Sequence, residues 1–341
     1  MEPLVTVLIP AYNAEKTLEA ALDSVRFQTY SNLEILLIND GSTDGTREIG
    51  LNYSRIDSRI LYIEGRENKK LVKVLNQGLQ RARGKYIARM DADDICRPER
   101  IRKQVDFMES HPEVDICGSW VRTFGGAWSR VWRFPKADRE IKRSLMYTCV
   151  LSHPAVMFRT ESVVSHGIKY KEDYLYAEDY ELWCRCMGNL VYYNLQEVLL
   201  DYRISPTQIS TNEITHPRQA FLTNKIISNN VKTYFGLDMD GGTAAGSETE
   251  RIEYFLQKIQ MIPDAVCRIK ELDNVGDKYA IVRGIFGHLY FPFEDRWWQT
   301  QIFFRYRLWQ LGALWSFKYT VKTLLGKRMV RQVRRIIRCG I

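Results

Sequence analysis

The sequence lacks the features that mark disulfide-built, zinc-binding and membrane-spanning proteins. Its seven cysteines are an odd number, and no two of them form a CxxC pair. Neither a disulfide framework nor a zinc site is indicated, so a reducing cytoplasm is the expected compartment. No stretch approaches the roughly 18 uncharged apolar residues of a spanning helix. The N-terminus has no basic segment before an apolar run, and no signal peptide is expected.

Both standard phosphate-binding loops are also missing, and acidic residues are absent from the C-terminal tail. The chain contains no GxGxxG and no GxxxxGK[ST] motif. Its net charge of +8 comes from 49 Lys and Arg against 41 Asp and Glu. Residues 296–341 hold eleven of the Lys and Arg and no acidic residue, so the rest of the chain has 38 cationic and 41 anionic side chains. The basic character therefore belongs to the tail.

The first part of the chain alternates between buried strands and amphipathic helices. The predicted strands cover residues 4–9, 33–38, 60–63 and 86–90. The first strand is stopped by Pro10, and apolar spacing predicts helices at 14–28, capped by Asn13, and at 70–83. This order predicts an α/β fold with a mostly parallel central sheet flanked by helices. Further along, the aromatic-rich segment 128–134 is predicted to be a strand.

Three carboxylates follow the fourth predicted strand within four residues, at Asp91, Asp93 and Asp94. Carboxylates this close repel one another unless a cation lies between them, and a hard divalent cation is one solution. The crevice outside the carboxyl ends of the strands is also where α/β sheets bind ligands. Aspartate is common in turns and as a helix cap as well. From this stretch alone, a metal site and a cap are both open.

Three other polar sites each have a structural and a functional interpretation. Asp40 ends the second strand, where a carboxylate either forms the turn or accepts a hydrogen bond from a base or ribose. His153 is a candidate contact of an acceptor or a diphosphate, or a hydrogen-bonded structural histidine. Glu178 and Asp179 open a helix predicted to begin near residue 178, where acidic residues are favoured on structural grounds alone.

Five motifs occur in an order and spacing that resemble one enzyme family. They are Val5-Thr6-Val7-Leu8-Ile9-Pro10-Ala11-Tyr12-Asn13, Asn39-Asp40-Gly41-Ser42-Thr43-Asp44, Asn76-Gln77-Gly78, Arg83-Gly84-Lys85-Tyr86-Ile87 and Asp91-Ala92-Asp93-Asp94. Together they resemble the inverting family-2 glycosyltransferases of the GT-A fold, over roughly residues 4–210. The resemblance implies metal-dependent transfer of a sugar from a nucleotide-sugar donor to a hydroxyl of a saccharide or lipid-linked acceptor. The donor is expected to be a UDP-linked sugar. The resemblance also implies a role in bacterial surface-polysaccharide synthesis.

The resemblance further implies where the donor binds. Pro10, Ala11 and Tyr12 would line the base pocket, and Asp40 would contact a uracil-type base. Asp91 would contact the ribose or the metal shell. These positions agree with the predicted fold, because all of them follow strands whose carboxyl ends meet at one edge of a parallel sheet.

By the same resemblance, Asp93 would bind Mn²⁺ or Mg²⁺ bridging the diphosphate. A departing nucleoside diphosphate builds negative charge that such an ion stabilises. Lys70, Lys73 and Arg89 are candidate helpers, although each also fits a solvated helix or strand charge. The sequence departs from the family pattern at Ser205, which replaces the histidine of a Tyr-Arg-x-His segment that can complete the metal shell. The third protein ligand is therefore unassigned.

The catalytic base is expected beyond the middle of the chain. In the family, a Glu-Asp pair before an aromatic residue carries the base, and Asp179 matches that position. An inverting displacement needs one carboxylate that takes the proton of the attacking hydroxyl, with no covalent intermediate. Glu178 and His153 are candidate contacts of the acceptor or the diphosphate.

Residues 1–212 are predicted to form the transferase domain and residues 213–341 a helical C-terminal region. The tail, 296–341, fits an amphipathic helix lying on the inner face of the cytoplasmic membrane. It equally fits a terminal helix packed on the domain. Nucleic acid is not an expected partner, because the basic residues lie outside a body that resembles a sugar transferase.

Two alternatives to a glycosyltransferase follow from the same fold. A non-catalytic protein that binds sugar nucleotides or lipids is disfavoured because Asp91, Asp93 and Asp179 are all present. A sugar-phosphate nucleotidyltransferase would need a Gly-rich loop with Arg or Lys after the first strand. The residues from Pro10 to Asn13 provide no such loop.

Overall fold

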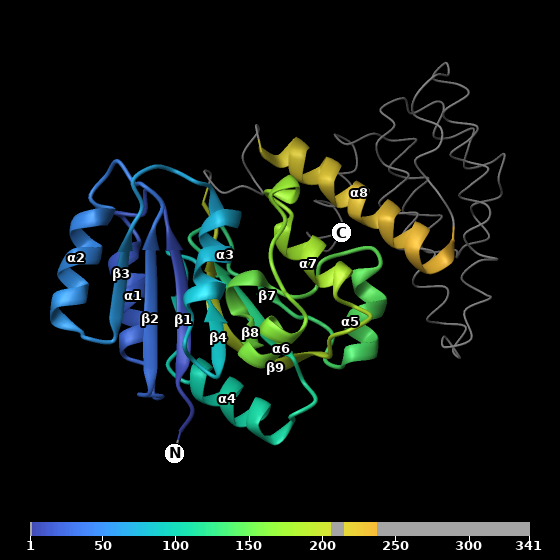
Figure 1. Cartoon of the computed structure of the whole chain (residues 1–341), viewed down its shortest axis with the longest axis horizontal. Coiled ribbons are helices and arrows are strands. Elements are labelled where there is room, and N and C mark those ends of the chain that lie inside the picture. The colour runs from blue at the N-terminus through green and yellow to red at the C-terminus, as the bar shows by residue number, and fades with distance from the viewer. Residues whose placement is uncertain (1, 206–214, 237–341) are drawn as a thin grey trace, which may run out of the picture. The chain divides into compact units, whose positions relative to one another are not determined.

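The computed structural model describes residues 2–205 and 215–236, and it contains the predicted alternation of strands and helices (Figure 1). The strands of the first half are β1 (Val5–Ala11), β2 (Leu33–Asn39), β3 (Ile60–Glu64) and β4 (Tyr86–Arg89). The helices are α1 (Leu18–Arg26), α2 (Thr46–Ile56) and α3 (Leu71–Arg81). The α/β fold class predicted from the sequence is therefore confirmed.

These four strands form a parallel sheet in the order β3-β2-β1-β4. Every residue of β1 and β2 is buried, as expected for a parallel sheet with helices on both faces. This burial accounts for the continuous apolar runs in the sequence. Because the strands are parallel, their carboxyl ends lie at one edge of the sheet, and the loops that follow them meet there.

The first strand continues through Pro10 to Ala11, so the prediction that Pro10 stops it is wrong. The N–H of Met90 donates to the Leu8 carbonyl oxygen at 3.1 Å, which shows that Leu8 points its backbone groups towards β4. Backbone direction alternates along a strand, so Pro10 also faces that side. β4 pairs with β1 only as far as Leu8, and the N–H that proline lacks would have no partner there.

Asn13 does not cap the first helix, which begins at Leu18 with Thr17 as its N-cap. Asn13 instead has a positive φ of 49°, a conformation that asparagine tolerates better than most residues. Its Oδ1 accepts a hydrogen bond from the Thr43 N–H at 2.9 Å, and its own N–H donates to Ser42 Oγ at 2.9 Å. The residue therefore joins the loops that follow β1 and β2.

Beyond β4 the sheet continues with strands that run in both directions. These strands are β5 (Ile95–Cys96), β6 (Ile116–Phe124), β7 (Val131–Trp132), β8 (Met157–Arg159) and β9 (Tyr192–Arg203). The order is β4-β8-β6-β9-β5, with β7 paired to β6. β8 is antiparallel to both of its neighbours, whereas β9 is parallel to β6. The sheet is thus parallel in its first four strands and mixed in the remainder.

Short helices connect the strands of this second half. They are α4 (Arg100–Ser110), α5 (Asp138–Leu145), α6 (Thr160–Ser165) and α7 (Glu178–Arg185), with 3-10 turns η1 (His153–Ala155) and η2 (Glu172–Tyr174). The longer helix α8 (Thr215–Phe235) follows β9. The helix predicted to begin near residue 178 is confirmed as α7. Among the described helices, none combines the length and apolar character needed to cross a membrane.

The strand predicted at 128–134 is mostly wrong, because only Val131 and Trp132 pair with β6. The Arg130 N–H donates to Thr123 Oγ1 at 2.8 Å, which helps close the hairpin between β6 and β7. The chain then leaves the sheet at Phe134. Its carbonyl accepts from the side chain of Trp120 at 3.1 Å instead of from a strand. A side-chain donor thus replaces the ladder hydrogen bond.

One compact unit extends to Ile226 and so includes the first turns of α8. The predicted division at residue 212 stays a prediction, because it falls in a stretch outside the described residues. The expected helical segments beyond α8 and the basic tail at 296–341 also lie outside the described residues.

Candidate active site

The five residues predicted to bind a nucleotide line one cavity of about 280 Å³ at the carboxyl ends of the parallel strands. Pro10, Ala11 and Tyr12 come from the end of β1, Asp40 directly follows β2, and Asp91 lies in the loop after β4. The Asp40 N–H donates to the Ala11 carbonyl at 2.8 Å, which holds two of these segments together. The structure therefore brings the predicted donor-side residues into one site.

Asp40 is buried and bonded to the loop that follows β3. The Lys69 N–H donates to its Oδ1 at 2.8 Å, while burial raises the pKa of this carboxyl. The next residue, Gly41, has a φ of 67°, and a Cβ there would lie 2.6 Å from the carbonyl carbon of Glu67. Glycine is required at this position by both conformation and space. Asp40 thus shapes the turn and also lines the cavity.

The acidic stretch forms a compact cluster in which Asp91, Asp93 and Asp94 each offer an oxygen within 4.8 Å of the others. Burial and the charge of Asp91 raise the pKa of Asp93 to about 6. Burial, followed by the charges of Asp91 and Asp93, raises the pKa of Asp94 well above its usual range. These shifts measure the repulsion and lost hydration that a bound cation would relieve.

Asp94 is not a helix cap, because α4 begins only at Arg100 with Glu99 as its N-cap. Its side chain is fully buried. Its Oδ1 accepts the Arg203 N–H at 2.8 Å, whereas its Oδ2 has no hydrogen-bond partner among the residues that the structure describes. A buried carboxylate oxygen without a donor is costly, and a hard cation that prefers oxygen ligands would satisfy it. The residues present therefore fit Mn²⁺ or Mg²⁺.

The end of β9 is fixed against the acidic stretch. Besides the bond to Asp94, Arg203 donates from Nε to the Asp93 carbonyl at 2.7 Å. Ser205, which takes the place of the family histidine, follows two residues later in the described part of the chain. Its contribution to a metal shell stays a prediction.

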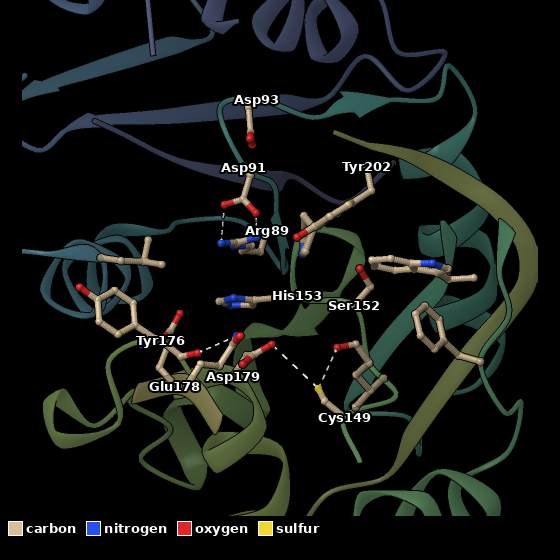
Figure 2. Close-up of a pocket in the computed structure, with 16 residues that line it drawn as sticks. Arg89, Asp91, Asp93, Cys149, Ser152, His153, Tyr176, Glu178, Asp179 and Tyr202 are labelled. Atoms are coloured by element: carbon tan, nitrogen blue, oxygen red, sulfur yellow. Dashed lines mark hydrogen bonds and ion pairs between the residues drawn. The ribbon is translucent and has the colours of Figure 1, made fainter. Parts of the chain in front are cut away.

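Arg89 is buried, and its interpretation as a solvated strand charge is wrong. Only 2% of its side chain is exposed, and it forms a two-pronged ion pair with Asp91 at 2.5 and 2.6 Å. Its Nε atom has no hydrogen-bond partner. Figure 2 shows Arg89 between Asp91 and His153. The guanidinium is therefore an internal cation that partly neutralises the acidic cluster.

Lys73, by contrast, pairs with exposed Glu172 at 3.4 Å.

A larger cavity of about 430 Å³ shares Asp91 and Tyr176 with the first one (Figure 2). Asp91 and Asp93 form one side of it, and Glu178 and Asp179, in the first turn of α7, form the other. In Figure 2 Arg89 and His153 lie between these two sides. A ligand that extends from the smaller cavity into the larger one would therefore have the acidic cluster and the α7 carboxylates on different sides.

Glu178 and Asp179 both line the larger cavity but have different partners. The Glu178 Oε2 accepts the Tyr176 N–H at 2.7 Å, which stabilises a turn in which Tyr176 has a φ of 88°. The Asp179 Oδ1 accepts the Tyr180 N–H at 2.7 Å, and its Oδ2 lies 3.9 Å from Cys149 Sγ. Burial and the charge of Asp179 raise the pKa of Glu178 to about 7, and burial also raises the pKa of Asp179.

His153 is buried and hydrogen-bonded, as its structural interpretation expects, and its contact with an acceptor or a diphosphate stays a prediction. It lines the larger cavity, and its Nε2 lies 2.8 Å from the Tyr170 hydroxyl oxygen. Burial, reinforced by the charge of Arg89, lowers the pKa of His153 well below its usual range. The imidazole is therefore neutral at physiological pH. It can exchange a hydrogen bond with a ligand, but it adds no positive charge to the cavity.

Four aromatic residues of the larger cavity were not among the predicted site residues: Trp132, Phe134, Tyr176 and Tyr202. Trp132 and Phe134 belong to the segment predicted as an aromatic-rich strand, and Tyr202 precedes Arg203 in β9. The ring centroids of Trp132 and Tyr202 lie 5.2 Å apart. Cys149 and Ser152 line the same cavity. The aromatic content of 128–134 was the one sequence signal that could have pointed to this surface.

The family model described as Glycosyl transferase family 2 matches residues 6–166 of the chain. An uncharacterised glycosyltransferase of Haemophilus influenzae is 32% identical over 250 residues, which cover 70% of this chain and 77% of that protein. The amylovoran biosynthesis glycosyltransferase AmsE of Erwinia amylovora is 36% identical over 211 residues, which cover 60% of this chain and 78% of that protein.

Two solved structures share the fold at low sequence identity. S. aureus TarS 1–349, solved with UDP-GlcNAc, has a TM-score of 0.56 at 16% identity, with 85% of this chain and 93% of that chain covered. The mannosyltransferase PcManGT of Pyrobaculum calidifontis, solved with GDP-Man and Mn²⁺, has a TM-score of 0.50 at 16% identity, with 95% and 88% covered. At this identity the likeness establishes the GT-A-type fold alone.

Proposed function

Because this chain belongs to glycosyl transferase family 2 and is a glycosyltransferase, we propose that it is a metal-dependent inverting enzyme whose donor is a nucleotide sugar. The observation that carries the proposal is the pair of cavities that share Asp91, one lined by the ends of the parallel strands and the other by Asp179. A nucleoside fits the first cavity, and the reacting sugar with its acceptor fits the second.

The donor is proposed to bind with its base near Asp40 and Tyr12 and its diphosphate over the acidic stretch. The two structural neighbours support this assignment, since one was solved with UDP-GlcNAc and the other with GDP-Man and Mn²⁺. A UDP-linked sugar is the proposed donor. Lys70 lines the nucleoside cavity, where its ammonium group is placed to help hold the donor.

Asp93 and Asp94 are proposed to hold the divalent cation, with Asp91 shared between the cation and Arg89. A bound Mn²⁺ or Mg²⁺ supplies Lewis-acid stabilisation of the charge that develops on the leaving diphosphate. Arg89 adds a fixed positive charge behind Asp91, at 2.5 Å from its carboxylate. Fixed charges of this kind need no reorganisation during the reaction, and they strengthen in a site from which water is excluded.

Asp179 is proposed to act as the general base. Its Oδ2 removes the proton from the acceptor hydroxyl as that oxygen forms a bond to the anomeric carbon of the donor sugar. The bond from the anomeric carbon to the diphosphate oxygen breaks in the same step, and its electron pair leaves with the nucleoside diphosphate. One displacement inverts the anomeric configuration. Tyr180 orients the base, because its N–H occupies the other carboxylate oxygen.

Cell-surface polysaccharide synthesis is the proposed setting, and the name of AmsE as an amylovoran biosynthesis enzyme supports it. The proposed location is the cytoplasm at the inner face of the membrane, where the basic tail 296–341 would bind anionic lipid. That tail lies outside the described residues. Deleting it should release the protein from the membrane fraction, and unchanged recovery there would contradict the proposed attachment.

Donor binding can be tested without knowledge of the acceptor. UDP together with Mn²⁺ should raise the melting temperature of the full chain, because a ligand that binds only the folded state stabilises it. Asp93→Asn should remove the Mn²⁺-dependent part of this increase. Asp173→Asn, an exposed carboxylate outside both cavities, makes the same change in net charge and should leave it intact. An equal response in the two variants would contradict the assignment of Asp93.

Transfer should depend on pH through the α7 carboxylates. The base acts in its deprotonated form, and burial raises the pKa of Asp179 and of its neighbour Glu178, the latter to about 7. Activity should therefore be lost as pH falls through the raised pKa of Asp179, by about tenfold per pH unit on the acidic limb. Glu178→Gln removes the neighbouring charge and should move the inflection to lower pH. A kcat/KM profile whose acidic inflection lies at or below the ordinary pKa of a solvated aspartate, about 3.9, would rule out a buried carboxylate base.

A further inference from the structure

We propose that Trp132, Phe134 and Tyr202, here called the aromatic wall, bind a neutral sugar ring that carries the attacking hydroxyl. The acceptor group next to the base is then the sugar end of a saccharide and not a phosphate. This inference rests on the proposed function in one respect, the assignment of Asp179 as the base. It adds the class of acceptor and the residues that recognise it.

The aromatic wall lies on the acceptor side of the site. All three side chains line the larger cavity together with Asp179, and none of them lines the nucleoside cavity. The two cavities share Asp91 and Tyr176, so a donor that extends from one to the other passes these residues first. Beyond them the larger cavity holds both the reacting sugar of the donor and the attacking group, and the aromatic wall is assigned to the attacking group.

Hydrogen bonds hold the backbone around the aromatic wall in place. Trp132 and Tyr202 are tilted by 40° with centroids 5.2 Å apart, and Trp132 keeps 40% of its surface exposed. The Phe134 carbonyl is fixed by the Trp120 side chain at 3.1 Å. Arg203, the residue after Tyr202, donates hydrogen bonds to Asp93 and Asp94 of the acidic stretch. A rigid aromatic surface loses little conformational entropy when it binds a ligand.

The charges around the larger cavity favour a neutral ligand at the aromatic wall. Four carboxylates line it: Asp91, Asp93, Glu178 and Asp179. Among the described residues that line it, the only cationic side chain is Arg89, which is already paired with Asp91 at 2.5 Å. Phosphate recognition normally uses Arg or Lys in direct contact with the oxygens. Within the described part of the cavity lining, a phosphate at this wall would meet carboxylates and no unpaired cation.

A pyranose matches the surface that is present. One face of such a ring carries C–H groups that pack on aromatic rings, while its hydroxyls need neutral hydrogen-bonding groups at the edge. Ser152 and Gln219 line the same cavity and offer a hydroxyl and an amide. The amide nitrogen of Gln219 donates to the Tyr176 carbonyl at 3.0 Å, which directs the side chain. The cavity therefore combines the apolar surface of the wall with neutral polar groups elsewhere on its lining.

The test uses fluorine NMR of the full chain labelled with 5-fluorotryptophan, in the presence of UDP and diamagnetic Mg²⁺, because paramagnetic Mn²⁺ would broaden the resonances of residues that share a cavity with Asp91 and Asp93. Trp132→Phe assigns the Trp132 resonance, and Trp128→Phe assigns a matched control on the same hairpin, since Trp128 is 77% exposed and does not line the cavity. The probes are methyl glycosides of glucose, galactose, mannose and N-acetylglucosamine. The Trp132 resonance should move with at least one of them while the Trp128 resonance stays in place.

A second measurement keeps the proposal independent of any one label. Trp132→Ala should weaken binding of that glycoside by about tenfold in saturation-transfer NMR, which corresponds to one lost stacking contact. UDP with Mn²⁺ should stabilise this variant as much as the wild type, which also shows that it folds. Trp128→Ala should bind the glycoside normally.

Three outcomes would overturn the proposal. In the first, none of the tested ligands moves the Trp132 resonance. In the second, farnesyl phosphate moves it and no glycoside does. In the third, UDP-GlcNAc or GDP-mannose moves it and no glycoside does. The last result would assign the wall to the sugar of the donor. Failure of the proposed function is distinguishable from these outcomes, because UDP and Mn²⁺ would then not stabilise the wild-type chain, or Asp179→Asn would keep the turnover of the wild type.

Discussion

Replacing Asp179 by asparagine is expected to lower the turnover of the donor by about 10² to 10⁴-fold, the usual contribution of a general base. Asparagine has nearly the same shape, and its Oδ1 can still accept the Tyr180 N–H that now lies 2.7 Å from the carboxylate. It cannot take a proton from the attacking hydroxyl. The donor for this assay is the nucleotide sugar that most raises the melting temperature of the wild type with Mn²⁺. The rate of nucleoside diphosphate release from this donor should fall without a matching loss of UDP affinity.

The adjacent Glu178→Gln variant is the matched control for this experiment. Glutamine can keep the hydrogen bond from the Tyr176 N–H, now 2.7 Å long, so the turn before α7 should survive. Its effect on turnover should be less than about tenfold, well below that of losing the base. If Glu178→Gln were the inactive variant and Asp179→Asn the active one, the roles of the two carboxylates would have to be exchanged.

Replacing Arg89 by methionine is expected to destabilise the metal-free protein by about 3 kcal/mol, because breaking a buried ion pair leaves its partner uncompensated. Asp91 would lose a two-pronged partner at 2.5 and 2.6 Å, and its repulsion with Asp93 and Asp94 would no longer be offset. Mn²⁺ supplies the missing charge, so it should restore more stability to the variant than it adds to the wild type. Denaturant unfolding with and without Mn²⁺ measures both effects.

Arg97→Met provides the comparison for Arg89. Arg97 pairs with Asp201 at 2.9 Å, but both side chains are partly exposed, at 31% and 24%. Such a pair contributes at most about 1 kcal/mol, and it lies outside both cavities. The Arg97 variant should therefore be nearly as stable as the wild type and indifferent to Mn²⁺. An equal loss in both variants would show that Arg89 has no special relation to the acidic cluster.

The parallel half of the fold was predictable because its signals are local. Continuous runs of β-branched and leucine residues predict β1 and β2, and their burial on both faces agrees with those runs. The ends of the elements were less predictable. Pro10 and Asn13 were assigned from their intrinsic preferences, whereas their roles depend on where β4 stops and on a loop thirty residues away along the chain.

The mixed half of the sheet could not be derived in the same way. β9 contains Asn194, Gln196 and Glu197, which break any alternating pattern, and its register with β6 shifts on either side of Trp120. Asn194 is nevertheless fully buried, because its amide donates to the carbonyls of Pro135 and Val150. Polar residues that are satisfied by distant backbone look like solvent-exposed ones in a sequence.

The candidate site also has one part that the sequence predicts and another that it does not. Asp40 and Asp91 could be placed together because both follow parallel strands, and the structure has them in one cavity. The burial of Arg89 depends on packing that no local pattern reports, and a charge at the end of a strand is usually solvated. Trp132 and Tyr202 meet only because β7 and β9 both pair with β6. Contacts of this kind become visible only once the sheet order is known.

The hydrogen bonds from Arg203 to Asp93 and Asp94 have a consequence for the binding of the two substrates. They connect the proposed metal site, along one residue of chain, to Tyr202 in the aromatic wall. These hydrogen bonds already hold the backbone beside Tyr202, and we expect a cation at the acidic stretch to change the affinity for the acceptor through this connection. Thermodynamic linkage makes this effect reciprocal. In an enzyme built in this way, whichever substrate binds first changes the affinity for the second.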